Sequence, residues 1–60
     1  MEESELQRLN AMLAIKNWHC GEHVTAKYGL HWTIINNNQK HKRQIVFSYK
    51  EGVEFANNIK

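Results

Sequence analysis

Apolar and polar side chains alternate along the chain from residue 24 to residue 34. Alternation with a period of two is typical of a β-strand that turns one face toward a core and the other toward water. The segment therefore predicts a sheet with one buried face. The even positions supply the buried face: Val24, Ala26, Tyr28, Leu30, Trp32 and Ile34. The odd positions supply the polar face: Thr25, Lys27, Gly29, His31 and Thr33.

The alternating segment fits a hairpin better than one long strand. A three-residue turn at residues 27–29 pairs Ala26 with Leu30 and keeps the even positions on one face, whereas a two-residue turn would place them on opposite faces. Gly29 then occupies the third turn position, where the left-handed conformation favours glycine. We therefore expect strands at residues 23–27 and 30–36. One continuous bent strand is the alternative.

The N-terminal segment has the pattern of an amphipathic helix. Ser4 and Gln7 have the spacing of a capping box, and three nearby glutamates suit the positive end of a helix dipole. Gly21 is a natural stop after the last turn. We expect a helix at about residues 5–20, packed on the apolar face of the sheet. Its apolar stripe consists of Leu6, Leu9, Met12, Leu13 and Ile15.

The C-terminal third predicts one more strand and a second helix. Polar residues 36–39 indicate a turn, and residues 43–48 are β-branched and aromatic enough for a strand, with Ile45 and Phe47 on one face. Ser48 and Glu51 again have capping-box spacing, which favours a helix at about residues 49–59. Gly52 weakens such a helix by about 1 kcal/mol. A hairpin at residues 50–52 followed by a strand is the alternative.

These elements predict a single α+β domain spanning residues 1–60. Its architecture is an N-terminal helix, a small antiparallel three-stranded meander and a short C-terminal helix. Sixty residues lie near the lower limit for independent folding. We expect a core of Leu6, Leu9, Leu13, Val24, Ala26, Leu30, Trp32, Ile34, Ile45, Phe47, Val53, Ala56 and Ile59.

Charge is distributed unevenly along the chain. The formal net charge is +2, and Glu2, Glu3 and Glu5 hold half of the carboxylates. From Leu6 onward, eight Lys and Arg residues face three glutamates, a net charge of +5. A basic body of this kind favours polyanionic partners.

The single cysteine and the absence of long apolar runs indicate the cellular setting. Small secreted domains usually contain several cysteines, so we expect a cytoplasmic protein. No apolar run approaches the roughly 20 residues that cross a bilayer, and the acidic N-terminus is unlike a signal peptide. We therefore expect no membrane partner.

The turn after the second strand is the leading candidate for a binding site. Three permanent cations and a histidine stand together at residues 40–43, where they would attract phosphates. Amide side chains beside them can hydrogen-bond base edges or backbone. The alternative is a solvated loop that keeps a small protein soluble. The candidate nucleic-acid-binding residues are Lys40, His41, Lys42, Arg43, Asn38 and His31.

The sequence shows no catalytic constellation and implies no cofactor. His19, Cys20 and His23 lie close together, but zinc commonly requires four ligands from two close pairs, and no second pair is present. Cys20 beside a histidine could form a thiol nucleophile, but no motif supplies an orienting group or an oxyanion site. We therefore expect neither a metal site nor an enzyme.

Part of the chain resembles a family of DNA-binding domains. The segment HWTIINNNQKHKRQIVFSYKEGVEFANNI resembles the small β-β-β-α arm-site domains of phage-type tyrosine integrases. Trp32 on a strand, the basic turn at residues 40–43, Phe47 and the helix start at residues 48–51 match in kind. Gly52 stands where a small alanine is usual, and the N-terminal helix has no counterpart. The resemblance covers about half of the chain and implies DNA contact by residues 31–44.

A second segment pair is similar to Cro-type phage repressors. VTAKYGLHWTIIN followed by RQIVFSYKEGVEF is similar to a helix-turn-helix followed by a hairpin. Ala26 and Gly29 are closer than the usual spacing in that motif, and the alternation argues against helices there. Both resemblances are associated with phages and other mobile elements.

The sequence therefore predicts a small non-enzymatic DNA-binding or DNA-associated accessory protein, with DNA a better candidate than RNA. The alternative is a protein-interaction module or a small inhibitor of a host protein. That module would use a sheet edge or an exposed apolar helix face. A homodimer formed through the same apolar face is a further alternative.

Overall fold

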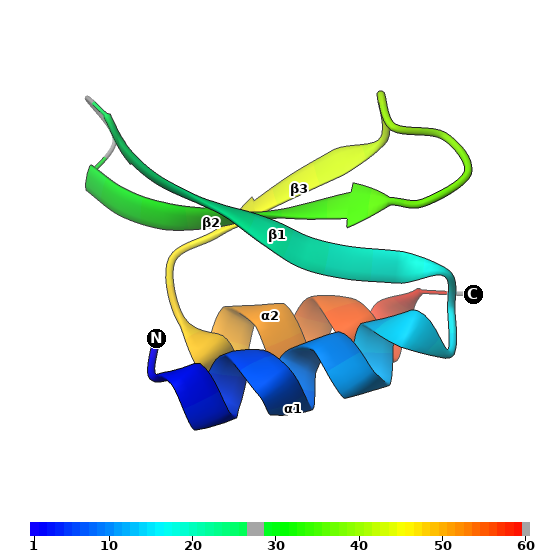
Figure 1. Cartoon of the computed structure of the whole chain (residues 1–60), viewed down its shortest axis with the longest axis horizontal. Coiled ribbons are helices and arrows are strands. Elements are labelled where there is room, and N and C mark those ends of the chain that lie inside the picture. Colours follow the sequence, from blue (N-terminus) through cyan, green and yellow to red (C-terminus); the bar gives the residue numbers. More distant parts are fainter. Residues whose placement is uncertain (27–28, 60) are drawn as a thin grey trace.

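The computed structural model of the chain describes residues 1–26 and 29–59, without the side chains of residues 22–26. The elements follow the order α1 (Glu3–Ala14), β1 (Trp18–Ala26), β2 (Gly29–Asn36), β3 (Arg43–Val46) and α2 (Tyr49–Asn58). The strands form an antiparallel sheet in the order β1-β2-β3. Both helices lie on one face of this sheet, and within the described residues no element covers the other face (Figure 1). The predicted α+β architecture is confirmed.

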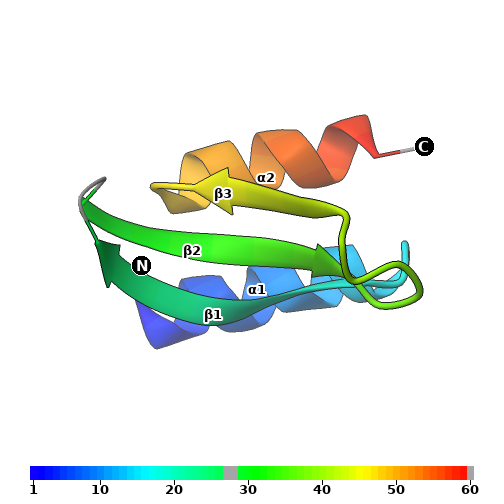
Figure 2. The same cartoon turned by 90° about the horizontal axis from the view of Figure 1, so that it is seen from above.

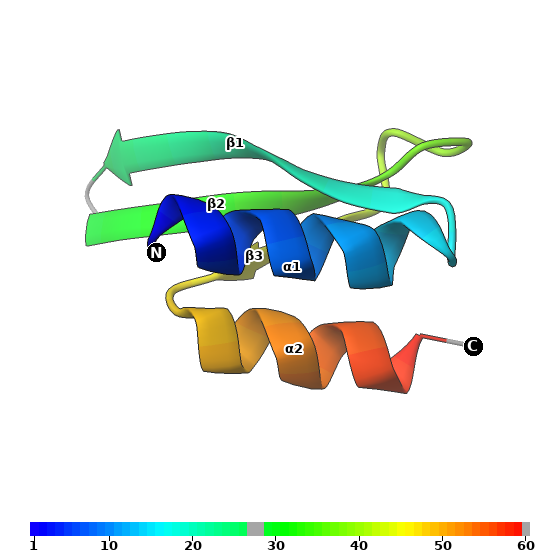
Figure 3. The same cartoon turned by 60° about the horizontal axis from the view of Figure 1, so that its bottom comes forward.

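The two helices run side by side in the same direction beneath the sheet (Figure 3). Seen from above, the strands lie in front of both helices, and β2 lies between the two edge strands (Figure 2). Neither helix, within the part of the chain that is described, is long and apolar enough to span a bilayer.

Helix α1 is shorter than the sequence predicts. It begins at Glu3, where the Glu5 carboxylate accepts a hydrogen bond from the Glu2 backbone N–H (3.1 Å), so Ser4 and Gln7 lie inside the helix instead of forming its cap. It ends at Ala14, and the predicted extension to residue 20 is wrong. Asn17 adopts a left-handed conformation (φ 64°), which ends the helical path and lets β1 begin at Trp18.

Gly21 lies inside a strand and forms a bulge. Cys20 pairs with Ile34 and Glu22 pairs with Thr33, so Gly21 is an extra residue in β1. The bulge shifts the pairing by one position, and at the end of β1 Ala26 pairs with Gly29. The predicted three-residue turn is wrong, although Gly29 does have a positive φ of 87°. Residues 27–28 lie outside the described residues.

The face of strand β3 that is turned toward the helices is not the one that the sequence predicts. Val46 pairs with Trp32, and both side chains are buried against the helices. Ile45 and Phe47 share the other face and are 43% and 48% exposed, so their placement in the core was wrong. Ile45, Val46 and Phe47 are all apolar, so the sequence pattern allows either face of the strand to be the buried one. Only the register with β2 decides which face it is. Leu30, also expected in the core, is 48% exposed.

The core lies between the helices and the sheet. Five predicted core residues are buried: Leu9, Leu13, Trp32, Ile34 and Ala56. Leu6, Val53 and Ile59 are partly buried, whereas the side chains of Val24 and Ala26 lie outside the described residues. Cys20 and Val46 complete the buried cluster, and Trp18 packs edge-to-face against Phe55 with ring centroids 5.3 Å apart.

Helix α2 begins as the sequence predicts. The Ser48 hydroxyl accepts a hydrogen bond from the Glu51 backbone N–H (3.3 Å), and the Glu51 carboxylate accepts one from the Phe47 N–H (2.7 Å). These bonds satisfy N–H groups at the start of the helix that have no partner within it. The alternative of a C-terminal strand is wrong, because residues 49–58 are helical.

Candidate functional site

The basic loop, defined here as residues 37–42 with the adjoining Arg43, connects β2 to β3. It lies at the end of the molecule where both helices finish, whereas the acidic N-terminus lies at the opposite end of the long axis (Figure 1). The fold therefore separates the two charged segments of the sequence along an axis of 29 Å.

Asn36 organises the backbone of the basic loop. Its side-chain oxygen accepts hydrogen bonds from the backbone N–H groups of Asn38 and Gln39, both at 2.8 Å. The Lys42 N–H donates to the Gln39 carbonyl (2.8 Å), and the Asn36 N–H donates to the Lys42 carbonyl (3.1 Å). Asparagine side chains commonly form such turns with the backbone that follows them. The loop is therefore a closed, hydrogen-bonded turn.

The basic loop is also bonded to the beginning of β1. The Asn37 N–H donates to the Asn17 carbonyl (2.8 Å), and Nδ1 of His19 hydrogen-bonds the side-chain oxygen of Asn37. These contacts fix the loop against the turn between α1 and β1.

The loop presents its basic side chains to solvent. Lys40, His41, Lys42 and Arg43 are all exposed. Nε of Arg43 donates to the Lys40 carbonyl (3.0 Å), so the Arg43 stem follows the loop backbone. Exposed ammonium and guanidinium groups on a fixed backbone can contact phosphates with little loss of backbone freedom.

The fold adds one cation that sequence reasoning missed. Lys16 is exposed and directly precedes Asn17, whose carbonyl binds the basic loop. Lys16 is therefore brought to the same end of the molecule as Lys40 and Lys42. No local signal in the sequence marks it, because the connection depends on the tertiary contact between Asn17 and Asn37.

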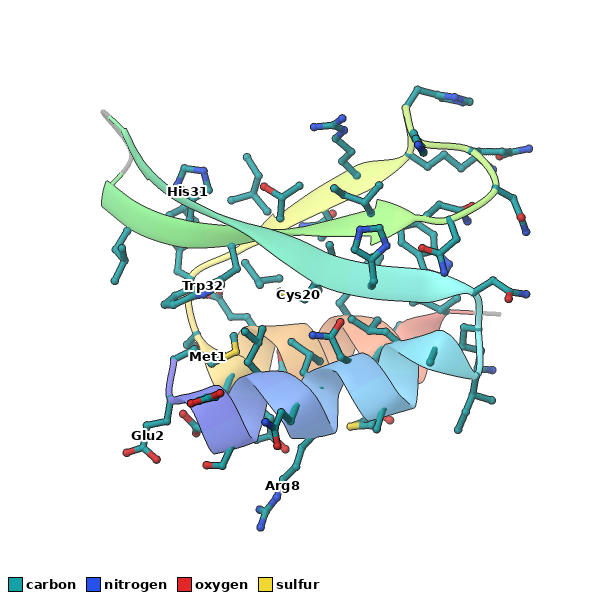
Figure 4. The ribbon with its side chains drawn as sticks, in the orientation of Figure 1. Met1, Glu2, Arg8, Cys20, His31 and Trp32 are labelled. Carbon is teal, nitrogen blue, oxygen red and sulfur yellow. The ribbon has the colours of Figure 1, made fainter. Side chains whose placement is uncertain are left out.

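The predicted site residues divide into two groups. Asn38 is exposed within the basic loop, beside the four basic residues. His31 is not brought to this cluster: it lies near the opposite end of β2, on the face of the sheet away from Trp32 (Figure 4). Its side chain is only 5% exposed, and Nδ1 lies 3.1 Å from the Gly29 carbonyl oxygen.

The cysteine lies in the core, away from solvent. Burial raises the pKa of the Cys20 thiol, so the thiol stays protonated at neutral pH. The Asn10 side chain makes two hydrogen bonds to the Cys20 backbone: its oxygen accepts from the N–H (2.7 Å) and its nitrogen donates to the carbonyl (3.2 Å). Among the described side chains, those of residues 1–21 and 29–59, no cluster of His, Cys, Asp or Glu has an arrangement that could hold a metal ion.

The basic loop thus combines a hydrogen-bonded backbone, exposed cations and a neighbouring lysine from another segment. This arrangement can attract and contact a polyanion. Comparison of the chain with protein-family models, curated proteins and solved structures gives no match.

Proposed function

We propose that this protein is a small, non-enzymatic DNA-binding protein that contacts phosphates through the basic loop. The observation that carries the proposal is the loop itself, in which Asn36 orders the backbone while Lys40 and Lys42 remain exposed. Lys16 extends the basic surface across the neighbouring turn. Phosphate contacts of this kind supply most of the affinity in sequence-independent DNA binding.

The shape of the site suits a nucleic-acid backbone. The loop is the end of a β-hairpin, an element narrow enough to enter a DNA groove. Asn38 is placed among the cations, where its amide can bond a base edge or the backbone. Cytoplasmic location and an origin in a mobile element remain parts of the same proposal.

Protein binding through a sheet edge receives less support. The Asn10 side chain occupies the N–H and carbonyl of Cys20 on β1, and the Gln44 side chain donates to the Ile45 carbonyl on β3 (3.3 Å). These bonds occupy groups that a further strand would pair. Leu6 and Met12 of α1 pack against the core, and the large exposed apolar side chain beside them is Ile15, just after the helix.

Neutralising the two exposed lysines tests the proposal. In the variant Lys40→Gln/Lys42→Gln, we expect weaker binding to duplex DNA and a salt dependence shallower by about 2 in the slope of log K against log salt, because two phosphate contacts are lost. Fluorescence anisotropy of a labelled duplex between about 50 and 200 mM salt measures both quantities.

The matched control is Arg8→Gln/Lys50→Gln, which removes the same charge from exposed positions on the helices. We expect this control to keep the wild-type slope. If both variants lose affinity equally, binding follows net charge alone and the basic loop is not the site. Absence of wild-type binding at low salt would also overturn the proposal.

A further inference from the structure

On the face of the sheet opposite the helices, Ile45 on β3 and Phe47 just after it are partly exposed apolar residues, whereas the outward residues of β2 are buried. Trp32 and Val46 turn toward the helices, so the residues between and beside them turn outward. The outward row on β3 consists of Arg43, Ile45 and, just beyond the strand, Phe47, and the neighbouring row on β2 consists of His31, Thr33 and Ile35. Figure 4 shows His31 on this outer face and Trp32 on the helix side.

Phe47 is held in place although it is half exposed. Its N–H donates to the Glu51 carboxylate (2.7 Å), and its ring packs edge-to-face against His31 with centroids 6.0 Å apart. His31 itself is nearly inaccessible, so it supports the Phe47 ring instead of contacting a ligand. The result is a positioned aromatic residue that is 48% exposed.

The outward row leads from this aromatic ring to the cations of the basic loop. Ile45 follows Phe47, and Arg43 follows Ile45, with about 7 Å between alternate residues of a strand. Arg43 is bonded to the Lys40 carbonyl and so joins the sheet face to the loop. An aromatic and apolar surface that ends in cations matches a ligand with flat apolar rings on an anionic backbone.

We infer that the outer sheet face binds a single-stranded nucleic acid, with a base stacked on Phe47 and the backbone running past Arg43 to the basic loop. Bases of a duplex are already stacked and paired, so their faces cannot meet this ring, whereas unpaired bases can. This inference rests on the proposed phosphate contacts of the loop.

A strand without bases isolates the contribution of the sheet face. We expect wild-type protein to bind oligothymidine at least about tenfold more tightly than an abasic deoxyribose-phosphate strand of equal length, because only the former can stack on Phe47. Oligouridine and oligothymidine compared in the same assay distinguish RNA from DNA. Equal affinity for the abasic strand and both oligonucleotides would overturn the inference. It would leave the proposed phosphate contacts of the basic loop unaffected.

The variant Phe47→Leu tests the same point from the protein side. We expect it to lose about tenfold in affinity for oligothymidine and to bind the abasic strand as wild type does. Leu30→Ala is the control, because Leu30 is also 48% exposed but belongs to the helix-facing positions of β2. Circular dichroism verifies that each variant is folded.

The variants separate failure of the inference from failure of the proposed function. Lys40→Gln/Lys42→Gln should weaken binding of the abasic strand and of both oligonucleotides, whereas Phe47→Leu should affect only strands with bases. If only the lysine variant has an effect, the loop binds phosphates and the sheet face does not bind bases. A dimer in sedimentation that Phe47→Leu dissociates would assign the face to a second copy and overturn the inference.

Discussion

At the scale of single residues, Gly52 lies where α2 closely approaches Leu9 of α1. A Cβ atom at this position would lie 2.6 Å from Cδ2 of Leu9, and Leu9 is fully buried. The sequence marks Gly52 only as a residue that weakens a helix. The structure gives the reason for its presence, because α2 approaches α1 closely where the side chain is missing.

Gly52→Ala should lower the free energy of unfolding by about 1 kcal/mol. Alanine gains about 1 kcal/mol in helix propensity, but overpacking of the core against Leu9 typically costs more than that. In a Leu9→Val background, which removes the clashing Cδ atoms, the same substitution should become stabilising. Urea unfolding of the wild type, the two single variants and the double variant measures the effect of Gly52→Ala on the free energy of unfolding in both backgrounds. A stabilising effect of Gly52→Ala in the wild-type background would show that the helices move apart at no cost.

At the scale of elements, the side-chain amide of Asn10 joins α1 to β1. Its two bonds to the Cys20 backbone take the place of a neighbouring strand on the edge of the sheet. Unpaired edges invite pairing with other chains, and native proteins commonly block them. Asn10 therefore both orients the helix and closes part of the edge.

Asn10→Ala should destabilise the protein by about 1–3 kcal/mol, because it leaves buried backbone groups of Cys20 without partners. It should also increase light scattering on concentration, since the edge of β1 becomes available. Asn57→Ala is the control, because Asn57 is an exposed residue in α2. Equal unfolding free energies for the two variants would mean that water replaces the Asn10 amide without loss.

The elements themselves were largely predictable, and their ends and faces were not. Period-two alternation and the Ser48 cap identified β2 and α2, because both signals are local. The end of α1 was misplaced because Gly21 was interpreted as a helix stop. The effective signal was Asn17, whose side chain tolerates the left-handed conformation that ends this helix. The faces of β3 depend on pairing with β2, which no local pattern fixes.

The candidate site shows the same division between local and tertiary information. The basic loop was visible in the sequence as a cluster of charges within a turn signal. Its ordering by Asn36 and its bonds to Asn17 and His19 were not visible, since they depend on residues far apart in the chain. The resemblance implies DNA contact by residues 31–44 and so includes His31, but His31 lies near the start of β2 and the basic loop follows its end.

At the scale of the whole molecule, charge is arranged along the longest axis. The acidic residues at the start of α1 lie at one end and the basic loop lies at the other (Figure 1). The axis measures 29 Å, well beyond the Debye length of about 8 Å at physiological salt but comparable with about 30 Å at 0.01 M. The acidic end should therefore influence binding at the basic loop only at low ionic strength.

Two variants that each raise the net charge by one unit test this separation. Gln39→Lys adds a cation in the basic loop, and Glu3→Gln removes a carboxylate at the far end, outside the Glu2–Glu5 contact that begins α1. At physiological salt, Gln39→Lys should raise the affinity for duplex DNA and steepen the salt slope by about 1, whereas Glu3→Gln should change neither. At about 0.01 M salt, where screening is weak, Glu3→Gln should also raise the affinity. Equal effects of the two variants at physiological salt would mean that binding responds to net charge and that the separation along the axis has no role in it.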